Sequence, residues 1–324
     1  MYKTFFELSR NPFEISPDPY FFYPTPRHNE ALANLYYGIR KQKGFVVVTG
    51  EVGTGKSLLI RCLIQTLQQS NVTFAYVFNT TLNPREFLEY VLVDLGLKHT
   101  TASKTDLLVT LNQFLVERHR RGLTTALIVD EAQNLRADVL EEVRLLTNLE
   151  TERQKLLQIV LVGQPELDDK MDSNELRQLK QRIGLRCKLE PLNFEEVPSY
   201  IQKRLERAGA ADRSRSLFPP ETVQSICRYS KGIPRLINTV CENALLTAYA
   251  LRAPAVTPEM VDEVARDFRL EQPLRGNGHD PLIALEDSAE ARGRKSVVQA
   301  LLNLLETAEP EAGISSAGKK GNYL

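Results

Sequence analysis

A glycine-rich loop that could bind phosphate follows an apolar segment near the start of the chain. Residues 45–49 read Phe-Val-Val-Val-Thr, and they lead into Gly50, Glu51, Val52, Gly53, Thr54, Gly55, Lys56 and Ser57. This is the spacing of a P-loop, in which glycines allow a tight turn and let backbone N–H groups reach phosphate oxygens. Lys56 would bring a positive charge to the β- and γ-phosphates, and the Ser57 hydroxyl would bind Mg²⁺. The apolar residues from Leu58 onward begin a helix whose N-terminus also favours an anion, so the segment predicts a nucleoside triphosphate site.

Two carboxylates follow a second apolar segment. Residues 126–129 are Ala-Leu-Ile-Val, and Asp130 and Glu131 come directly after them. Such a pair can simply end a strand, but in a chain with a P-loop it has the form of a Walker B strand that lies beside the P-loop strand. Asp130 would then hold Mg²⁺ through water, while Glu131 would orient and polarise a water that attacks the γ-phosphate.

Two amides also follow expected strands. Gln164 comes after Leu161-Val162-Gly163, where it could contact the γ-phosphate or the attacking water, and a surface loop residue is the alternative. Asn79 comes after the second strand and could hydrogen-bond Glu131, holding it away from water, although asparagine there also favours a plain turn. Both amides are therefore candidates, and Asn79 is the weaker one.

Arginines form two further groups of candidates. Arg177, Arg182 and Arg186 surround the join between a polar helix and the last expected strand. In a ring of subunits, one of them could reach the γ-phosphate of a neighbour, because a planar guanidinium stabilises spreading charge; we choose Arg182 first and Arg186 second. Arg235 lies in the first turn of a helix, where its own helix dipole is unfavourable, so we expect it to act on the nucleotide instead.

These residues need a parallel sheet to bring them together. Apolar segments predict strands near 45–49, 73–78, 125–129, 156–162 and 185–189, the last with the alternation of an edge strand. Helical periodicity separates them, with helices expected over 28–41, after the P-loop, 83–95, 104–121 and up to about 150. Strands that alternate with helices, and that are mostly apolar on both faces, predict an α/β fold covered on both sides.

The order of these patterns divides the chain into four parts. Residues 1–26 are rich in proline and aromatics and predict an extended arm, and residues 27–191 hold the α/β ATPase core. Residues 192–270 predict a small all-α lid domain, and residues 271–324 a flexible tail with one short helix near 295–306. Four helices are expected in the lid, over 194–208, 219–230, 234–252 and 257–268.

Composition excludes several classes but does not identify a partner. The chain has 324 residues, room for two domains, and its 41 Lys and Arg balance 41 Asp and Glu, so no global charge favours nucleic acid or membrane. The four cysteines form no C-x-x-C pair, which suits reduced thiols better than a disulfide scaffold or a zinc site. No stretch reaches the ~18 apolar residues of a membrane span, so we expect a cytoplasmic protein, at most peripheral at the inner membrane.

In order along the chain, these motifs resemble the AAA+ superfamily, and within it the bacterial ATPases of the general secretion pathway protein A type. Relatives of that type include exosortase-associated and transposition-associated ATPases. The resemblance covers about residues 1–270. The residues that carry it are Asn11-Pro12-Phe13, Pro17-Asp18-Pro19, His28, Glu30-Ala31-Leu32, the segment 44–57, Asp130-Glu131-Ala132-Gln133, Gly163 to Leu167, Gln181-Arg182-Ile183 and Gly232 to Asn238.

The resemblance implies a P-loop NTPase sheet in the order 5-1-4-3-2 with a helical lid. It implies Gln164 as sensor 1, Arg182 as arginine finger and Arg235 as sensor 2, with the adenine near residues 37–40. It also implies ATP and Mg²⁺ as ligands and assembly into homo-oligomeric rings or filaments. Secretion members often carry a transmembrane helix and a peptidoglycan-binding domain that this sequence does not contain, so a role in secretion would need a membrane-bound partner.

The leading hypothesis is an Mg²⁺-dependent ATPase that powers or regulates a secretion or cell-envelope assembly system. One alternative is an ATP-dependent DNA-binding regulator of the transposition type, which neutral charge disfavours although Arg118-His119-Arg120-Arg121 leaves it open. A second alternative is a nucleotide-gated scaffold that scarcely hydrolyses ATP, and Glu131 argues against it.

Overall fold

The computed structural model of this chain describes residues 2–98, 103–210 and 214–270. The expected tail over 271–324, with its helix near 295–306, lies outside the described residues. The strands are β1 Phe45–Gly50, β2 Val72–Val77, β3 Thr124–Val129, β4 Leu157–Gly163 and β5 Leu185–Leu189. The helices of the first 190 residues are α1 Tyr2–Phe5, α2 Pro26–Arg40, α3 Lys56–Gln68, α4 Pro84–Asp94, α5 Lys104–Arg120, α6 Ala137–Leu146, α7 Glu166–Met171 and α8 Arg177–Lys180, with short 3-10 turns at Pro19–Phe21, Ala132–Asn134 and Asn174–Leu176. The later helices are α9 Glu196–Arg207, α10 Ser214–Leu217, α11 Pro220–Ser230, α12 Pro234–Ala250 and α13 Pro258–Asp267.

The five strands form one parallel sheet in the order β2-β3-β4-β1-β5. Counted from β5, this is the predicted order 5-1-4-3-2, so the expected α/β sheet is confirmed. The inner strands β1, β3 and β4 are buried along their whole length, whereas β5 alternates between buried and exposed residues. The alternation follows from the position of β5 at an edge of the sheet, as the sequence predicts.

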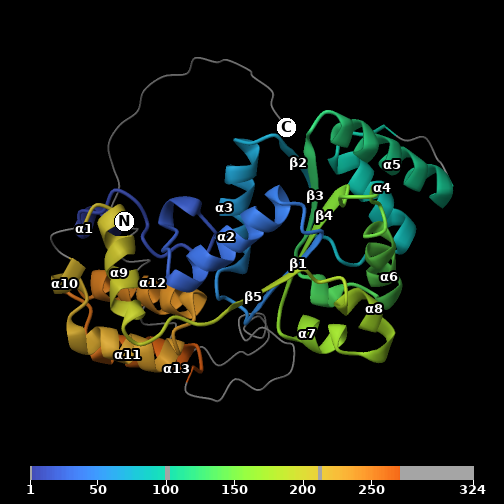
Figure 1. The fold of residues 1–324 in the computed structure, drawn as a ribbon. Coiled ribbons are helices and arrows are strands. Elements are labelled where there is room, and N and C mark those ends of the chain that lie inside the picture. Colours follow the sequence, from blue (N-terminus) through green and yellow to red (C-terminus); the bar gives the residue numbers. More distant parts are fainter. Residues whose placement is uncertain (1, 99–102, 211–213, 271–324) are drawn as a thin grey trace, which may run out of the picture.

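Alternate residues of the strands belong to two hydrophobic layers. Val46 and Val48 pack with α2 and α3 on one face, while Phe45 and Val47 pack with α4, α5 and α6 on the other. Figure 1 shows these two groups of helices on opposite sides of the sheet. Because strands covered on both faces must be apolar on both faces, the continuous apolar segments of the sequence are explained.

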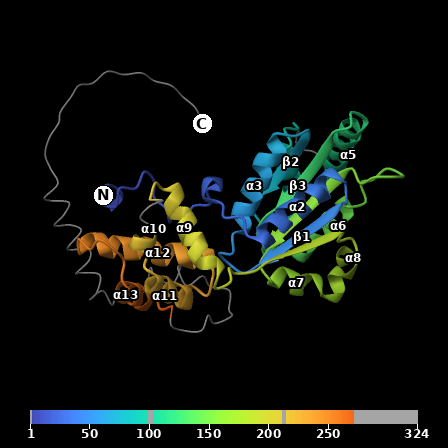
Figure 2. The same ribbon diagram turned by 60° about the vertical axis from the view of Figure 1, so that its left-hand side comes forward.

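Helices α9 to α13 form a separate all-α unit with its own buried cluster, and Figure 2 shows it beside the end of the sheet. The sequence predicts four helices here. The described structure has a fifth, the four-residue α10, which is too short to leave a periodic pattern.

The proline-rich segment before α2 is less extended than expected. It contains the short helix α1 and a 3-10 turn at Pro19–Phe21, and the rings of Tyr2, Phe6, Phe13 and Phe21 are buried in the cluster of the helical unit. Phe13 packs edge-on against Phe218 with ring centroids 5.7 Å apart, and the Tyr2 hydroxyl donates to the Glu242 carboxylate at 2.8 Å. The N-terminal segment is thus part of the core of the helical unit. Within the described residues, no helix combines the length and the apolar character that a membrane crossing requires.

Candidate functional site

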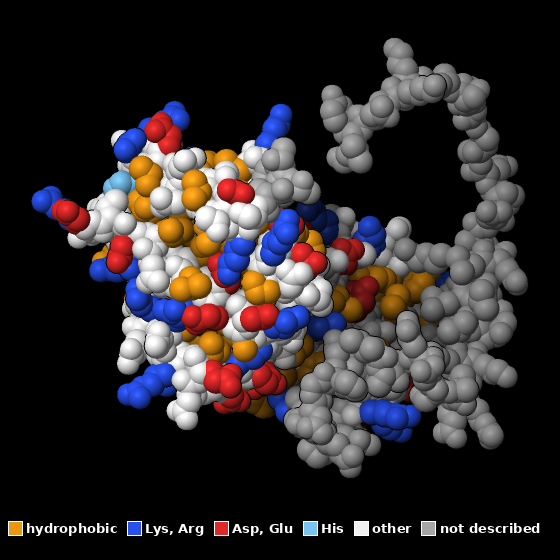
Figure 3. All heavy atoms as spheres, turned by 90° about the vertical axis from the view of Figure 1, so that its right-hand side faces the viewer, with side chains coloured by type: hydrophobic (Ala, Val, Ile, Leu, Met, Phe, Trp, Pro, Cys, Tyr) orange, Lys and Arg blue, Asp and Glu red, His pale blue; other side chains and the backbone are white. Residues whose placement is uncertain are grey.

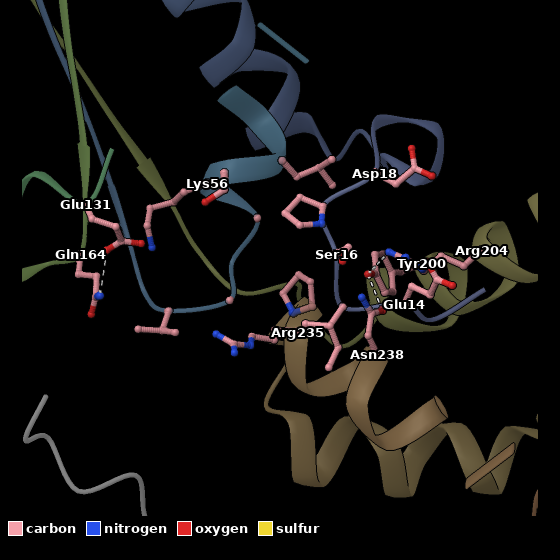
Figure 4. Close-up of a pocket in the computed structure, with 18 residues that line it drawn as sticks. Glu14, Ser16, Asp18, Lys56, Glu131, Gln164, Tyr200, Arg204, Arg235 and Asn238 are labelled. Atoms are coloured by element: carbon pink, nitrogen blue, oxygen red, sulfur yellow. Dashed lines mark hydrogen bonds between the residues drawn. The ribbon is translucent and has the colours of Figure 1, made fainter. Parts of the chain in front are cut away.

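A cavity of about 300 Å³ lies between the sheet and the helical unit. Three parts of the chain line it: the P-loop with two strand ends, the N-terminal segment and the start of α12 with part of α9. Figure 4 shows their side chains around one space. The lining residues are Glu14, Ile15, Ser16, Pro17, Asp18, Val52, Gly53, Gly55, Lys56, Ser57, Leu58, Glu131, Gln164, Tyr200, Arg204, Pro234, Arg235 and Asn238.

The P-loop turns directly from β1 into α3. Gly55 has a φ of 98° and caps α3, a conformation that suits glycine. A Cβ at Gly50 would lie only 2.6 Å from the Leu189 carbonyl oxygen of β5, so the loop needs a glycine there for packing as well. The Lys56 ammonium is buried and donates to the carbonyl oxygens of Gly50 and Glu51 at 2.7 and 2.9 Å. Burial lowers the pKa of Lys56, while the nearby carboxylates of Glu131 and Asp130 act in the opposite direction.

A buried histidine supports the loop from behind. His28 Nε2 lies 3.2 Å from the Thr54 carbonyl oxygen, and its Nδ1 lies 2.6 Å from Thr25 Oγ1. Burial lowers the pKa of His28, which favours the neutral ring. A neutral ring that donates from Nε2 to Thr54 and accepts at Nδ1 from Thr25 satisfies both contacts. The sequence offered His28 only as part of the family resemblance.

The structure brings Asp130 and Ser57 together at the carboxyl edge of the sheet. Ser57 Oγ lies 3.3 Å from Asp130 Oδ2, and the Tyr76 hydroxyl donates to the same oxygen at 3.0 Å. Asp130 is buried, and burial raises the pKa of its carboxyl despite these hydrogen bonds. Tyr76 escaped the sequence analysis because it lies in the middle of an expected strand, where an aromatic residue has an ordinary packing role.

Glu131 and Gln164 also meet at the cavity. Gln164 Nε2 donates to Glu131 Oε2 at 3.3 Å, as the dashed line in Figure 4 marks. Glu131 has a φ of 50°, a left-handed conformation that is costly for a residue with a side chain and that recurs at functional sites. Asn79 does not contact Glu131 as the weaker hypothesis had it. Its Oδ1 accepts from the backbone and hydroxyl of Thr81, so Asn79 forms a turn.

Arg235 brings the helical unit against the P-loop. Its backbone N–H donates to the Gly53 carbonyl oxygen at 3.2 Å, and Figure 4 shows its side chain extending from the start of α12 toward the loop. A Cβ at Gly53, where φ is 81°, would lie 2.7 Å from the Cβ of Arg235. Gly53 is therefore required both for the turn and for the close approach of α12.

The N-terminal segment over residues 14–18 is the part of the cavity that sequence reasoning missed. It is tied to α3 by Arg61, whose guanidinium donates to the Pro17 carbonyl oxygen at 2.5 Å. Residues 37–40, expected near the adenine, are not among the residues that line this cavity. They end α2 near the start of β1, where Tyr37 faces the Lys43 ammonium. Pro17-Asp18-Pro19 carries part of the family resemblance, but nothing in the local sequence indicates a position beside the P-loop.

The three arginines around α8 do not line the cavity. Arg177 and Arg182 are exposed on the core domain, and Arg186 lies 3.2 Å from the Asp168 carboxylate. Asp168 in turn accepts from the Thr49 hydroxyl at 2.8 Å, so Arg186 is held at the end of β1. A contact between Arg182 and a nucleotide would therefore have to be made with another copy of the chain.

The parallel sheet, the P-loop and the acidic strand end define a P-loop NTPase fold of the AAA type. Residues 39–171 match the family described as AAA domain. Two solved structures share the fold at low sequence identity. Aeropyrum pernix ORC2 protein, in ADPNP-ADP complexes, is 17% identical with a TM-score of 0.53 over 78% of this chain and 72% of that chain. Drosophila ORC bound to DNA is 19% identical with a TM-score of 0.57 over 92% and 79%.

One curated relative is similar to most of this chain. General secretion pathway protein A of Aeromonas hydrophila is 45% identical to this chain over 251 residues. The matched part is 77% of this chain and 45% of that relative, so the chain spans less than half of its length. The resemblance to the general secretion pathway protein A type, stated from the motifs, is confirmed by this similarity.

Proposed function

We propose that this chain binds ATP with Mg²⁺ and hydrolyses it. The observation that carries the proposal is the gathering of Lys56, Ser57, Glu131 and Gln164 around one cavity, with Asp130 hydrogen-bonded to Ser57. The cavity fits a nucleotide, because Gly53 and Gly55 adopt the positive φ angles of a phosphate-binding turn at its wall, and because the buried lysine supplies a positive charge.

Each residue has a separate part in the reaction. The loop N–H groups and Lys56 would bind the phosphate oxygens, and Arg235 would bind them from the helical unit. Ser57 and Asp130, an oxygen donor set that suits Mg²⁺, would hold the ion, which supplies positive charge to the transferring phosphoryl group. Glu131 would accept a proton from the attacking water, and the Gln164 amide would orient that water.

The test is the Glu131→Gln variant. The amide keeps the size of the side chain but cannot accept the proton, so phosphate release should fall by roughly 100-fold or more while ATP affinity stays within a few-fold. Glu166→Gln is the matched control, because Glu166 is an exposed carboxylate of α7 beside the same site. Unchanged phosphate release in Glu131→Gln would contradict the assignment of the base, and a wild-type protein that binds ATP without hydrolysis would favour the scaffold hypothesis.

We further propose that the ATPase works in a secretion or cell-envelope assembly system, as an oligomer on the cytoplasmic side of the inner membrane with a membrane-bound partner. The similarity to general secretion pathway protein A supports this role, although the chain matches less than half of that relative. Exposed Arg182 remains our choice for the residue that would complete the site of a neighbouring copy. In Figure 3, acidic and basic side chains of the described residues are mixed over the face that carries α4 to α6, and they form no band of positive charge there that would favour the DNA-binding alternative.

A further inference from the structure

The carboxylate of Glu131 is held by two glutamines, and the closer one lies outside the cavity lining. Gln133 Nε2 donates to Glu131 Oε2 at 2.6 Å, compared with 3.3 Å for Gln164 Nε2. Both amides bind the same carboxylate oxygen. Among the described residues, Oε1 of Glu131 is therefore the oxygen that is left to accept a proton from water.

The amide of Gln133 is itself fixed in direction. Its Oε1 accepts from the backbone N–H of Gln164 at 3.0 Å, so its Nε2 must point the other way, toward Glu131. Its backbone carbonyl oxygen accepts from the Lys170 ammonium at 2.9 Å, and the same ammonium donates to the Leu135 carbonyl oxygen. Lys170 thereby holds the 3-10 turn that carries Gln133 against α7.

Gly163 makes room for this arrangement. It ends β4, and a Cβ at this position would lie 2.9 Å from Gln133 Oε1. Any larger residue would push the amide away from the Gln164 backbone, and with it the Nε2 that binds Glu131. Gly163 and Gln164 thus affect Glu131 in two ways. The Gln164 side chain binds its carboxylate, and the Gln164 backbone fixes the Gln133 amide that binds the same oxygen.

We propose that Gln133 is the positioning residue for Glu131 in ATP hydrolysis. It holds one oxygen of the Glu131 carboxylate and links the direction of that carboxylate to Gln164. The sequence offered Asn79 as a residue that would bind Glu131 and hold it away from water, whereas Asn79 binds Thr81 instead. The inference rests on the proposed ATPase function.

The test compares Gln133→Met, a variant of similar length without hydrogen bonds, with Asn79→Ala and Asn134→Ala. Asn134 is the exposed neighbour of Gln133 on the same turn. Gln133→Met should lower kcat on the order of tenfold, with KM and ATP affinity within twofold of wild type, because the carboxylate is misdirected only for the chemical step. Both controls should keep wild-type kcat. Gln133→Asn, which keeps the polarity but is one methylene shorter, should show the same loss and covers the case that methionine disturbs folding.

A double-variant cycle separates positioning from a structural role. If Gln133 acts through Glu131, adding Gln133→Met to Glu131→Gln should leave the residual phosphate release within twofold. A further tenfold loss in the double variant, a wild-type kcat in both Gln133 variants, or a loss in Asn79→Ala instead would each overturn the inference. A wild-type protein that releases no phosphate would overturn the proposed function and this inference with it, whereas an active wild type with active Gln133 variants overturns only the inference.

Discussion

The two sides of the cavity are built in different ways. On the core side, Lys56, Asp130, Glu131 and Gln164 each follow the end of a strand, so sheet order alone brings them together. On the lid side, the segment over residues 14–18 meets α9 and α12 only through tertiary packing. Arg204 Nε, for example, donates to the Pro12 carbonyl oxygen 192 residues away. The positions of the core-side residues are therefore set by the strands that they follow, whereas the positions of the lid-side residues depend on how the N-terminal segment packs.

The strongest test of the core side is Lys56→Ala. Loss of the buried ammonium removes the main charge for the phosphates, so the ATP dissociation constant should rise about 100-fold. Lys43→Ala is the matched control, since Lys43 is exposed at the opposite end of β1 and should bind ATP like wild type. Titration with ATP measures both, and near-equal affinities would mean that the cavity does not bind phosphates through this loop.

The lid side is tested by Arg204→Ala. Arg204 is only 4% exposed, donates to the Tyr200 hydroxyl at 2.8 Å, and its guanidinium lies 4.9 Å from the Phe21 ring centroid. Its loss should lower the free energy of unfolding by about 2–4 kcal/mol and release the N-terminal segment, with a smaller loss of ATP affinity, about tenfold.

Urea unfolding, limited proteolysis of residues 2–25 and ATP titration give the three readings. Lys203→Ala, on the exposed face of the same helix, is the control. If Arg204→Ala kept the resistance to proteolysis and the ATP affinity of wild type, the lid side of the cavity would not depend on the packing of the N-terminal segment.

The smallest effect concerns Asp130, whose ionised form costs stability. Burial raises the pKa of Asp130 in the folded protein, so the folded chain keeps a proton where the unfolded chain has lost it. Stability must then fall as the pH rises from the ordinary carboxyl pKa through the folded one. Asp130→Asn, without Mg²⁺ or nucleotide, should be more stable than wild type at pH 7, and the difference should shrink at pH 4.

Unfolding curves at the two pH values measure this difference, with Asp169→Asn as an exposed control on α7. An equal gap at both pH values would show that the ionised carboxylate is not its cause. A gain in stability on loss of a proposed Mg²⁺ ligand would show that the buried carboxylate of the core side costs stability in the absence of its ligands.

Most of the fold and of the core side could be predicted from the sequence, because apolar segments, strand ends and glycine turns are each encoded by neighbouring residues. The sequence pattern indicated all five strands, while their order was implied by the family resemblance, and it indicated Asp130, Glu131 and Gln164 as neighbours. It missed Tyr76 and Gln133, whose roles depend on hydrogen-bond direction rather than on residue type and spacing. It also missed residues 14–18, because their approach to the P-loop is set by aromatic packing against helices near the other end of the described chain.

The pairing of β5 with β1 has a consequence for where this protein can be cut. The matched AAA region ends at residue 171, before β5 begins, although β5 pairs with β1 from Val46↔Leu185 to Gly50↔Leu189. A fragment over 39–171 would turn the apolar central strand β1 into an open sheet edge. Such an edge, with unpaired backbone groups and exposed valines, invites strand addition from other molecules. A fragment that ends where the matched AAA region ends should therefore aggregate more readily than one that includes β5.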